Sequence, residues 1–415
     1  MRILLIPVGS AGDVHPYVGV GLALQRRGHD VRVITSPYFS SLLDRVGLPL
    51  IHLGTVDDFR VLFNDPSLWS ATRGIKVIGQ GLARSTTELY RLIKNETQQE
   101  QTVLIAPGMA FAARVAHETL GVPLVTMHLQ PTCFMSQYET CVFHPWLSTI
   151  NKWPAVLKRQ ALRSADWVSD RALAPGINSL RQTLGLAPVR HIVRDWWHSP
   201  SHVIGLFPDW YAAPQPDWPQ NTTLTGFPLY DEHEVNTIEP DLNKFLSDST
   251  ERPIIFTPGS ANTQAKKFFE AAVDACRRLK HRGLLLTRFP EQVPNVLPAG
   301  IHHATYAPLS DILPHAAALV HHGGIGTAAQ AMRAACPQLV MPMAFDQPDN
   351  ADRLYRLGIG RSLWPPSSFT GRRVANKLNT LLGSSAVSRA CNTVAQRFVG
   401  NDPMSSTCAL IESVN

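Results

Sequence analysis

The chain has 415 residues, of which 44% are hydrophobic and 17% charged, and its formal net charge at pH 7 is +6. That length suits two domains better than one, and no apolar run reaches the roughly 18 to 20 residues of a membrane span, which excludes an integral membrane protein. The positive charge is diffuse and no nucleic-acid motif accompanies it. It therefore fits a small anionic ligand or an acidic membrane surface and excludes a DNA or RNA partner.

The first segment, "ILLIPV" (residues 3–8), predicts a buried strand. It is too short for a secretory signal and no small-residue cleavage site follows it, so we expect a cytoplasmic protein that can also work at the inner face of the membrane. The cysteines stand at no C-x-x-C or zinc-type spacing, which predicts reduced thiols. They are Cys133, Cys141, Cys276, Cys336, Cys391 and Cys408.

Strands and helices alternate along the N-terminal half. The first strand is followed by a helical pattern over residues 17–28, with apolar residues at three- and four-residue spacing, and then by a strand over 29–35. The same order of strand, helix and strand recurs between residues 102 and 129. Short strands that alternate with helices imply a parallel sheet covered on both faces.

The C-terminal half repeats this organisation, so the predicted fold class is α/β, with two facing Rossmann-like domains and an interdomain cleft. A segment dense in proline, aromatic residues and turn formers separates the halves and predicts a linker. We expect an N-terminal acceptor-side domain at 1–206, the linker at 207–231, a C-terminal domain at 232–390 and a final helical segment, 391–415, that can return to the N-terminal domain.

The sequence "HHGGIGT" (residues 321–327) follows a predicted strand and opens a helix. Its glycines let the backbone approach a ligand closely and adopt positive φ. The free amides and the dipole at the start of a helix suit a diphosphate. A metal site is disfavoured because adjacent histidines point in different directions and no third ligand stands at a usable spacing. A purely structural turn is the remaining alternative.

Two further segments accompany this loop, "YAPLSDILP" (306–314) and "PMAFDQPDNADRLYRLGIG" (342–360). Together the three resemble the nucleotide-sugar signature of the family 1 glycosyltransferases, which are inverting enzymes of the GT-B fold. The N-terminal "GSAGDVHPYVGVGLALQRRGHDV" (9–31) resembles the opening of their acceptor-binding domain. Within that family, "FTPGS", "TGFPLYD" and "HSP" (198–200) are most similar to the rhamnosyltransferase of rhamnolipid biosynthesis.

The resemblance implies a set of donor-binding residues. His321, with the amides of the glycine loop, would stabilise the charge that builds on the leaving diphosphate, while His322 would be structural. Tyr306 would stack on the base, unless it is a core tyrosine, and Asp346 and Gln347 would bind sugar hydroxyls. The implied residues are Ser260, Tyr306, Ala307, His321, Gly323, Gly324, Gly326, Thr327, Asp346 and Gln347.

On the acceptor side the resemblance implies that Asp13 is the catalytic base, since it follows the first strand where the family keeps its catalytic Asp or His. A positioned base typically contributes about 10²- to 10⁴-fold. The alternative is that Asp13 only caps the following helix. His15, two residues after Asp13, is a candidate for contact with acceptor or donor. Trp146 and Trp197 are acceptor-side candidates because most tryptophans precede residue 220 and suit a hydrophobic acceptor, with core packing as the alternative.

The function implied is inverting transfer of a sugar, without metal or cofactor, from a nucleotide-sugar donor to a hydroxyl of a hydrophobic acceptor. Ala329 stands where relatives that use UDP-sugars often have a Glu for the ribose hydroxyls, which favours a dTDP-linked sugar such as dTDP-L-rhamnose. The fatty-acid-derived acceptor is implied by the resemblance alone. A UDP-glucose-dependent enzyme acting on a sterol or polyketide is the alternative. A nicotinamide-dependent oxidoreductase is disfavoured because "GSAGDVHP" is not G-x-G-x-x-G.

Overall fold

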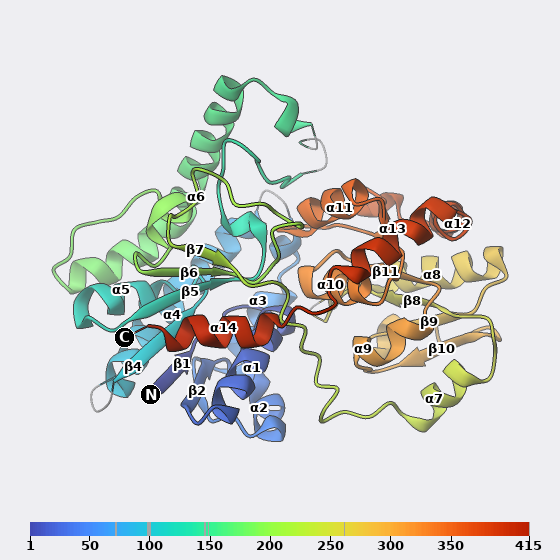
Figure 1. The fold of residues 1–415 in the computed structure, drawn as a ribbon, viewed down its shortest axis with the longest axis horizontal. Coiled ribbons are helices and arrows are strands. Elements are labelled where there is room, and N and C mark those ends of the chain that lie inside the picture. The colour runs from blue at the N-terminus through green and yellow to red at the C-terminus, as the bar shows by residue number, and fades with distance from the viewer. Residues whose placement is uncertain (71–72, 98–100, 145–146, 148, 261, 415) are drawn as a thin grey trace. The chain divides into compact units, whose positions relative to one another are not determined.

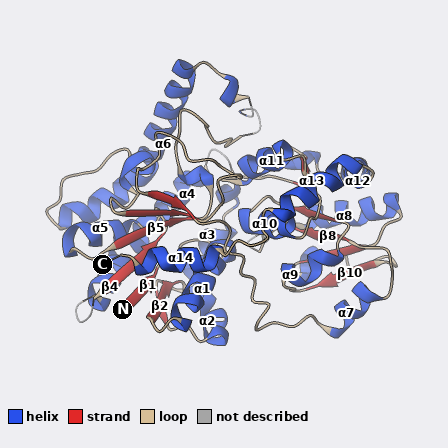
Figure 2. Ribbon diagram, viewed as in Figure 1, coloured by secondary structure: helices blue, strands red, loops and turns tan. Residues whose placement is uncertain are grey.

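The computed structural model describes residues 1–414 except 71–72, 98–100, 145–146, 148 and 261. The chain divides into two compact units. The first comprises Met1–Val142, Trp146–Pro228 and Asp402–Asn415, and the second comprises Phe143–Pro145 and Leu229–Asn401. Each unit is a parallel sheet covered by helices, as Figure 2 shows.

The strands of the first unit are ordered β3-β2-β1-β4-β5-β6-β7, and every neighbouring pair is parallel. The central strands β4 and β5 are buried along their whole length, as expected for a sheet covered on both faces. The strand bounds are β1 Arg2–Leu5, β2 Asp30–Thr35, β3 Leu50–His52, β4 Thr102–Ala106, β5 Leu124–His128, β6 His202–Gly205 and β7 Thr222–Leu224.

Helices cover both faces of this sheet (Figure 1). The α-helices are α1 Ala11–Arg26, α2 Ser40–Val46, α3 Val56–Asn64, α4 Gly74–Glu96, α5 Phe111–Leu120, α6 Ala155–Thr183 and α14 Pro403–Glu412. Short helical turns are η1 Pro37–Phe39, η2 Pro66–Trp69, η3 Pro131–Cys133, η5 Ile150–Lys152 and the π-turn η6 Ile192–Trp196. Helix α14 lies beside α1 (Figure 1), where Glu412 pairs with Arg27 and His29, both at 2.9 Å.

The second unit repeats the same topology in the order β10-β9-β8-β11-β12-β13, again with parallel neighbours. Its strands are β8 Ile254–Thr257, β9 Gly283–Leu286, β10 Ile301–Ala304, β11 Ala318–His321, β12 Gln338–Val340 and β13 Gly360–Ser362. Its α-helices are α7 Pro240–Ser247, α8 Lys266–Leu279, α9 Leu309–Ile312, α10 Ile325–Arg333, α11 Gln347–Arg356, α12 Gly371–Leu382 and α13 Ser385–Gln396. Its 3-10 turns are η7 Pro290–Gln292, η8 Leu313–His315 and η9 Pro366–Ser368.

The prediction of two Rossmann-like α/β domains is confirmed. In both units the strand order reverses beside the first strand, at β1/β4 and at β8/β11, and ligands of such sheets bind at this switch point, outside the carboxyl ends of the strands. The segment expected to be a linker, 207–231, divides between the units after Pro228, and the expected C-terminal segment divides after Asn401. Among the described residues, no helix is long and apolar enough to cross a membrane.

Candidate functional site

The switch point of the first unit carries Asp13, in the first turn of α1. Its Oδ2 accepts hydrogen bonds from the backbone N–H of Ser10 at 2.7 Å and from the Ser10 hydroxyl at 3.1 Å. Gly9 has φ of +135° and a Cβ there would collide with the Asp13 carboxylate. Ser10 is the N-cap residue of α1, and Asp13, at the third helical position, binds back to it through Oδ2. Oδ1 takes no part in these bonds.

Burial raises the pKa of Asp13 from 3.8 to about 6, against the opposing effect of the Ser10 hydrogen bonds. Desolvation disfavours the charged form of a carboxyl group, which explains the direction of the shift. A general base works best when its pKa lies near the working pH. Asp13 thus has the properties of a base poised close to neutrality.

Asp13 lines a small cavity of about 40 Å³ together with residues that follow β4 and β5. Trp197, expected on the acceptor side, also lines it and approaches the backbone so closely that a Cβ on Gly108 would lie 2.6 Å from the indole. The structure therefore brings Asp13 and Trp197 to one site. His15 is a partly buried residue of α1, and Trp146 lies outside the described residues.

The cavity also contains a histidine that sequence reasoning did not single out. His128 is the last residue of β5, is 1% exposed and lines the cavity. Its Nε2 lies 3.1 Å from Nδ1 of His198, and His198 Nε2 accepts the indole N–H of Trp197 at 3.1 Å. Burial lowers the pKa of His198 to about 4 and that of His128 well below its usual value.

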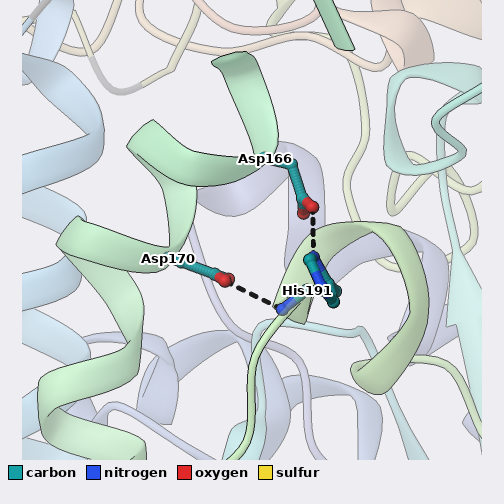
Figure 3. Close-up of side chains that lie close together, drawn as sticks. All are labelled: Asp166, Asp170 and His191. Atoms are coloured by element: carbon teal, nitrogen blue, oxygen red, sulfur yellow. Dashed lines mark hydrogen bonds and ion pairs between the residues drawn. The ribbon is translucent and has the colours of Figure 1, made fainter. Parts of the chain in front are cut away.

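Trp197 follows the turn η6, which is anchored by two aspartates of α6 (Figure 3). Asp170 accepts the backbone N–H groups of His191 and Ile192 at 2.8 and 3.0 Å. Asp166 Oδ2 lies 2.5 Å from His191 Nδ1 and 3.3 Å from the Arg194 guanidinium.

The ligand atoms of Asp166, Asp170 and His191 lie within 4.8 Å of one another, a spacing that could hold a metal ion. An arginine already neutralises one carboxylate, and the other caps the turn, so the contacts of this cluster explain it as a structural anchor. It fixes the turn that precedes Trp197, which lines the cavity, and His198, which contacts the cavity residue His128.

The switch point of the second unit joins the loop after β8 to the "HHGGIGT" loop after β11. A Cβ on Gly259 would lie 2.8 Å from the ring of His322, and a Cβ on Gly324 would lie 2.6 Å from it. Gly323 has φ of +102° and packs against Val340. The glycines thus allow a close approach between two loops and leave the start of α10, with exposed Gly326, open to solvent.

The two histidines of this loop have different surroundings. His321 is fully buried, and both ring nitrogens are used: Nδ1 accepts the N–H of Gly323 at 3.1 Å and Nε2 lies 3.0 Å from Gln338 Oε1. His322 packs between Gly259 and Gly324, and its Nδ1 is buried with no hydrogen-bond partner among the described residues. Burial lowers the pKa of His321 to about 3 and of His322 to about 4, so both are neutral.

The expected sugar-binding segment also braces this loop. Asn350, fully buried in α11, donates to the carbonyl of Gly323 at 2.8 Å and to Asp346 Oδ2 at 2.7 Å. Gln347 is 4% exposed and its Oε1 accepts the N–H of Met343 at 2.8 Å. Asn350 therefore holds the glycine loop, whereas Gln347 holds the loop between β12 and α11.

The remaining expected donor residues lie near the ends of neighbouring strands. Tyr306 follows β10, donates its hydroxyl to the carbonyl of Asp231 at 2.8 Å, and lies under the Arg288 guanidinium at 5.2 Å. Ala307 is 3% exposed, whereas Ser260, in the loop after β8, is exposed. Thr327 is partly buried in the first turn of α10.

Comparisons with known proteins match both halves of the chain to glycosyltransferase-type domain families. Residues 3–143 match the glycosyltransferase family 28 N-terminal domain, and residues 286–408 match the erythromycin biosynthesis protein CIII-like C-terminal domain. The chain is a glycosyltransferase of the GT-B fold. Transfer by the enzymes of these families inverts the anomeric centre and needs no metal, and their donor is a nucleotide sugar used as substrate.

Individual relatives are similar to this glycosyltransferase over nearly its whole length. The O-mycaminosyltylonolide 6-deoxyallosyltransferase of Streptomyces fradiae is 28% identical over 442 residues, which cover 99% of this chain and 97% of the relative. A sterol 3-beta-glucosyltransferase of Arabidopsis thaliana is 26% identical over 97% of this chain and 64% of its own length. The spinosyn rhamnosyltransferase SpnG with thymidine diphosphate superposes with a TM-score of 0.69 at 19% identity, covering 99% and 100% of the two chains.

Sequence reasoning did not single out His128 and His198, and it expected His322, whose Nδ1 has no partner among the described residues, to be structural. The signal for His128 was its position at the carboxyl end of a predicted central strand, where ligands of parallel sheets bind. His198 could be found only once its partner 70 residues earlier was known.

Proposed function

We propose that this glycosyltransferase moves L-rhamnose from dTDP-L-rhamnose to a hydroxyl group of a fatty-acid-derived acceptor, as in rhamnolipid synthesis. The proposal of a lipophilic acceptor rests on Asp13, a carboxylate with a pKa of about 6 in a largely apolar cavity. A hydroxyl bound there has its base beside it, and the apolar lining favours the hydrocarbon of a lipophilic molecule.

In the proposed reaction Asp13 Oδ1 takes the proton of the acceptor hydroxyl as its oxygen attacks the anomeric carbon. The bond from that carbon to the diphosphate oxygen breaks, and the electron pair leaves with the dTDP. The negative charge is stabilised by the free amides at the start of α10, including those of Gly326 and Thr327. No metal ion is required to balance this step.

We propose different roles for the two histidines of the glycine loop within the donor site. His321, with both ring nitrogens engaged, holds the loop in shape. His322, which the sequence predicts to be structural, is only partly buried and lies beside Gly324 at the start of α10, so we propose that this imidazole, rather than that of His321, contacts the phosphates. Tyr306 and Ala307 receive the thymine base, Ser260 reaches the phosphates, and the segment starting at Asp346 and Gln347 receives the sugar.

The proposed choice of dTDP rests on the residue type at position 329 of α10. Ala329 is 1% exposed and offers no acceptor to the two hydroxyls of a ribose, so a deoxyribose loses nothing by binding there. SpnG, named as a rhamnosyltransferase and solved with thymidine diphosphate, supports the same assignment. A UDP-glucose donor is the alternative, supported by the relative named as a sterol glucosyltransferase.

We also propose that the N-terminal half of α6 rests on the membrane. This half stands out from the sheet (Figure 1) and exposes apolar side chains, with Trp167 61% and Val156 68% exposed. Basic side chains flank them, and the Arg171 guanidinium lies 5.0 Å over the Trp167 ring. Aromatic and basic residues on one exposed helix suit an anionic bilayer surface, where a lipidic acceptor would partition.

The test is a coupled assay of purified enzyme with dTDP-L-rhamnose or UDP-glucose and a 3-(3-hydroxyalkanoyloxy)alkanoic acid, followed by mass spectrometry of the product. The proposal predicts a rhamnosylated lipid with the first donor and at most trace product with the second. Product from UDP-glucose alone, with a sterol in place of the lipid, would establish the alternative instead.

A further inference from the structure

Three buried side chains form a hydrogen-bonded row that ends at the Asp13 cavity. Trp197 Nε1 lies 3.1 Å from His198 Nε2, and His198 Nδ1 lies 3.1 Å from His128 Nε2. The three residues are 8%, 5% and 1% exposed. Two of them follow the anchored turn η6 and the third closes strand β5, so the fold brings them together from distant segments.

The chemistry of the first member fixes the hydrogens of the other two. An indole nitrogen can only donate, so His198 Nε2 must be the acceptor of that bond. A neutral His198 therefore carries its hydrogen on Nδ1 and donates to His128, whose Nε2 must accept. The hydrogen of His128 consequently lies on Nδ1, the tautomer set by a neighbour rather than by solvent.

Protonation of either histidine is incompatible with these hydrogen bonds. A charged His198 would place an N–H against the indole N–H, and a charged His128 would place one against His198 Nδ1–H. Both rings are buried, and burial lowers both pKa values, for His198 against the smaller opposing effect of Asp195. His128 is thus held as a neutral hydrogen-bond donor through Nδ1.

The surroundings of His128 define what this N–H can bind. None of the hydrogen bonds among the described residues uses His128 Nδ1, and His128 lines the same cavity as Asp13. The Tyr17 hydroxyl, also at this cavity, is already donated to the carbonyl of Met127 at 2.8 Å. A cavity of about 40 Å³ has room for roughly three water-sized groups. The group that meets His128 must therefore lie within a few bonds of the hydroxyl that meets Asp13.

We infer that His128 is a specificity-determining residue whose Nδ1–H donates to a second oxygen of the acceptor, close to the reacting hydroxyl. The inference rests on the proposed acceptor site and narrows its substrate class. Acceptors with a hydroxyl next to a carbonyl, ether or second hydroxyl, such as 3-hydroxyacyl compounds, make this bond. An isolated secondary alcohol leaves the N–H unpaired, and a site built to donate a hydrogen bond discriminates against such a ligand.

The test pairs two variants with two acceptors. In His128→Gln the side-chain amide reaches the place of Nε2 and keeps the contact with His198, but the donor at Nδ1 is lost. In His128→Asn the shorter amide takes the place of Nδ1 and keeps the donor. The acceptors are a methyl 3-hydroxyalkanoate and a secondary alcohol of the same chain length, compared by their ratio of kcat/KM with dTDP-L-rhamnose.

Wild-type enzyme should prefer the hydroxy ester by about ten-fold or more, His128→Asn should keep most of that preference, and His128→Gln should reduce it to near one. The KM for the donor should not change. An equal ratio in wild type and His128→Gln would overturn the inference, as would equal losses on both acceptors in both variants, because these describe a merely structural histidine.

The tautomer can be read independently from the ¹⁵N spectrum of the imidazoles in the intact enzyme. We expect Nδ1–H on His128 and His198, with a shift of the His128 signal when the hydroxy ester binds. An Nε2–H signal on His128, or no shift on binding, would contradict the inference. Failure of the wild type to glycosylate either acceptor would count against the proposed function, and the spectrum would still decide the state of His128.

Discussion

Asp13→Asn should stop turnover and at the same time stabilise the enzyme. The amide cannot take a proton, so kcat should fall by about 10²- to 10⁴-fold. It also removes a charge that burial disfavours. Since the pKa of Asp13 rises from 3.8 in the exposed state to about 6 in the fold, ionisation at neutral pH costs the folded enzyme up to about 3 kcal/mol.

The raised pKa of Asp13 makes the stability difference between Asp13→Asn and wild type depend on pH. The folded enzyme binds the Asp13 proton more tightly than the unfolded chain, so wild-type stability falls as the pH rises from about 4 to about 6. The variant should therefore gain its full advantage above pH 6 and lose it below pH 4. Part of the gain is offset because an amide oxygen accepts the Ser10 hydrogen bonds less strongly, which leaves about 1 to 3 kcal/mol.

Asp13→Ala is the matched control, because it removes the base together with both Ser10 contacts. It should lose turnover equally but be destabilised by about 1 kcal/mol relative to Asp13→Asn. The assays are initial rates between pH 5 and 9 and thermal unfolding at pH 4 and 8. Wild-type kcat/KM should rise with pH and level off above about 6. A variant with a tenth or more of wild-type turnover, or Asp13→Asn less stable than wild type at pH 8, would refute the assignment.

Three further predictions concern the donor loop, its helix and the exposed helix. His322→Ala should weaken thymidine diphosphate binding by about ten-fold with little change in Tm. His321→Ala should lower Tm by several degrees, because a buried hydrogen-bonded pair is broken. If calorimetry finds the loss of binding in His321→Ala and the loss of stability in His322→Ala, the roles of the two histidines are the opposite of those proposed. Gly326→Asp should fold normally, because a Cβ there meets only open space, but charge repulsion should abolish diphosphate binding. Unchanged affinity for thymidine diphosphate would show that the diphosphate does not bind at the start of α10. Val156→Ser with Trp167→Ser should reduce co-sedimentation with anionic vesicles and leave turnover of a soluble short-chain acceptor unchanged, while retention of vesicle binding would exclude α6 as the contact.

The fold could be predicted because its signals are local. Apolar runs such as "ILLIPV" and "AALVHH" end in glycine-containing loops, and each is followed by a helical pattern, so a parallel sheet with loops at one edge is the arrangement that buries them. The glycine-rich loop at 321–327 lies at the carboxyl end of β11 for the same reason.

The roles of individual side chains could not be predicted from the sequence as well as the fold could. His321 and His322 are neighbours with the same composition around them, and only the three-dimensional contacts separate the ring that is tied on both sides from the ring that is not. Gln347 and Asn350 match a sugar-binding pattern, but Gln347 accepts a hydrogen bond from the backbone of Met343, and Asn350 donates to the Gly323 carbonyl and to Asp346. A motif identifies residues that act together without saying which of them reaches the ligand.

Long-range polar contacts explain the rest of what sequence reasoning missed. His128 is the last residue of an apolar strand segment, and His198 and Trp197 come 70 residues later, after a turn that two aspartates of α6 hold in place. Asp166 and Asp170 gave no sign in the sequence of supporting a catalytic cavity, because the turn they anchor begins more than 20 residues after them. Such pairs become visible only when the chain is folded.

The most direct test of glycosyl transfer by this chain is the anomeric configuration of its product. Purified wild-type enzyme, given dTDP-L-rhamnose and a 3-hydroxyacyl acceptor, should form a rhamnoside whose proton NMR spectrum shows the anomeric configuration opposite to that of the donor, with release of one dTDP per glycoside. A product of retained configuration, or release of dTDP without any glycoside, would contradict direct attack by an acceptor hydroxyl activated at Asp13.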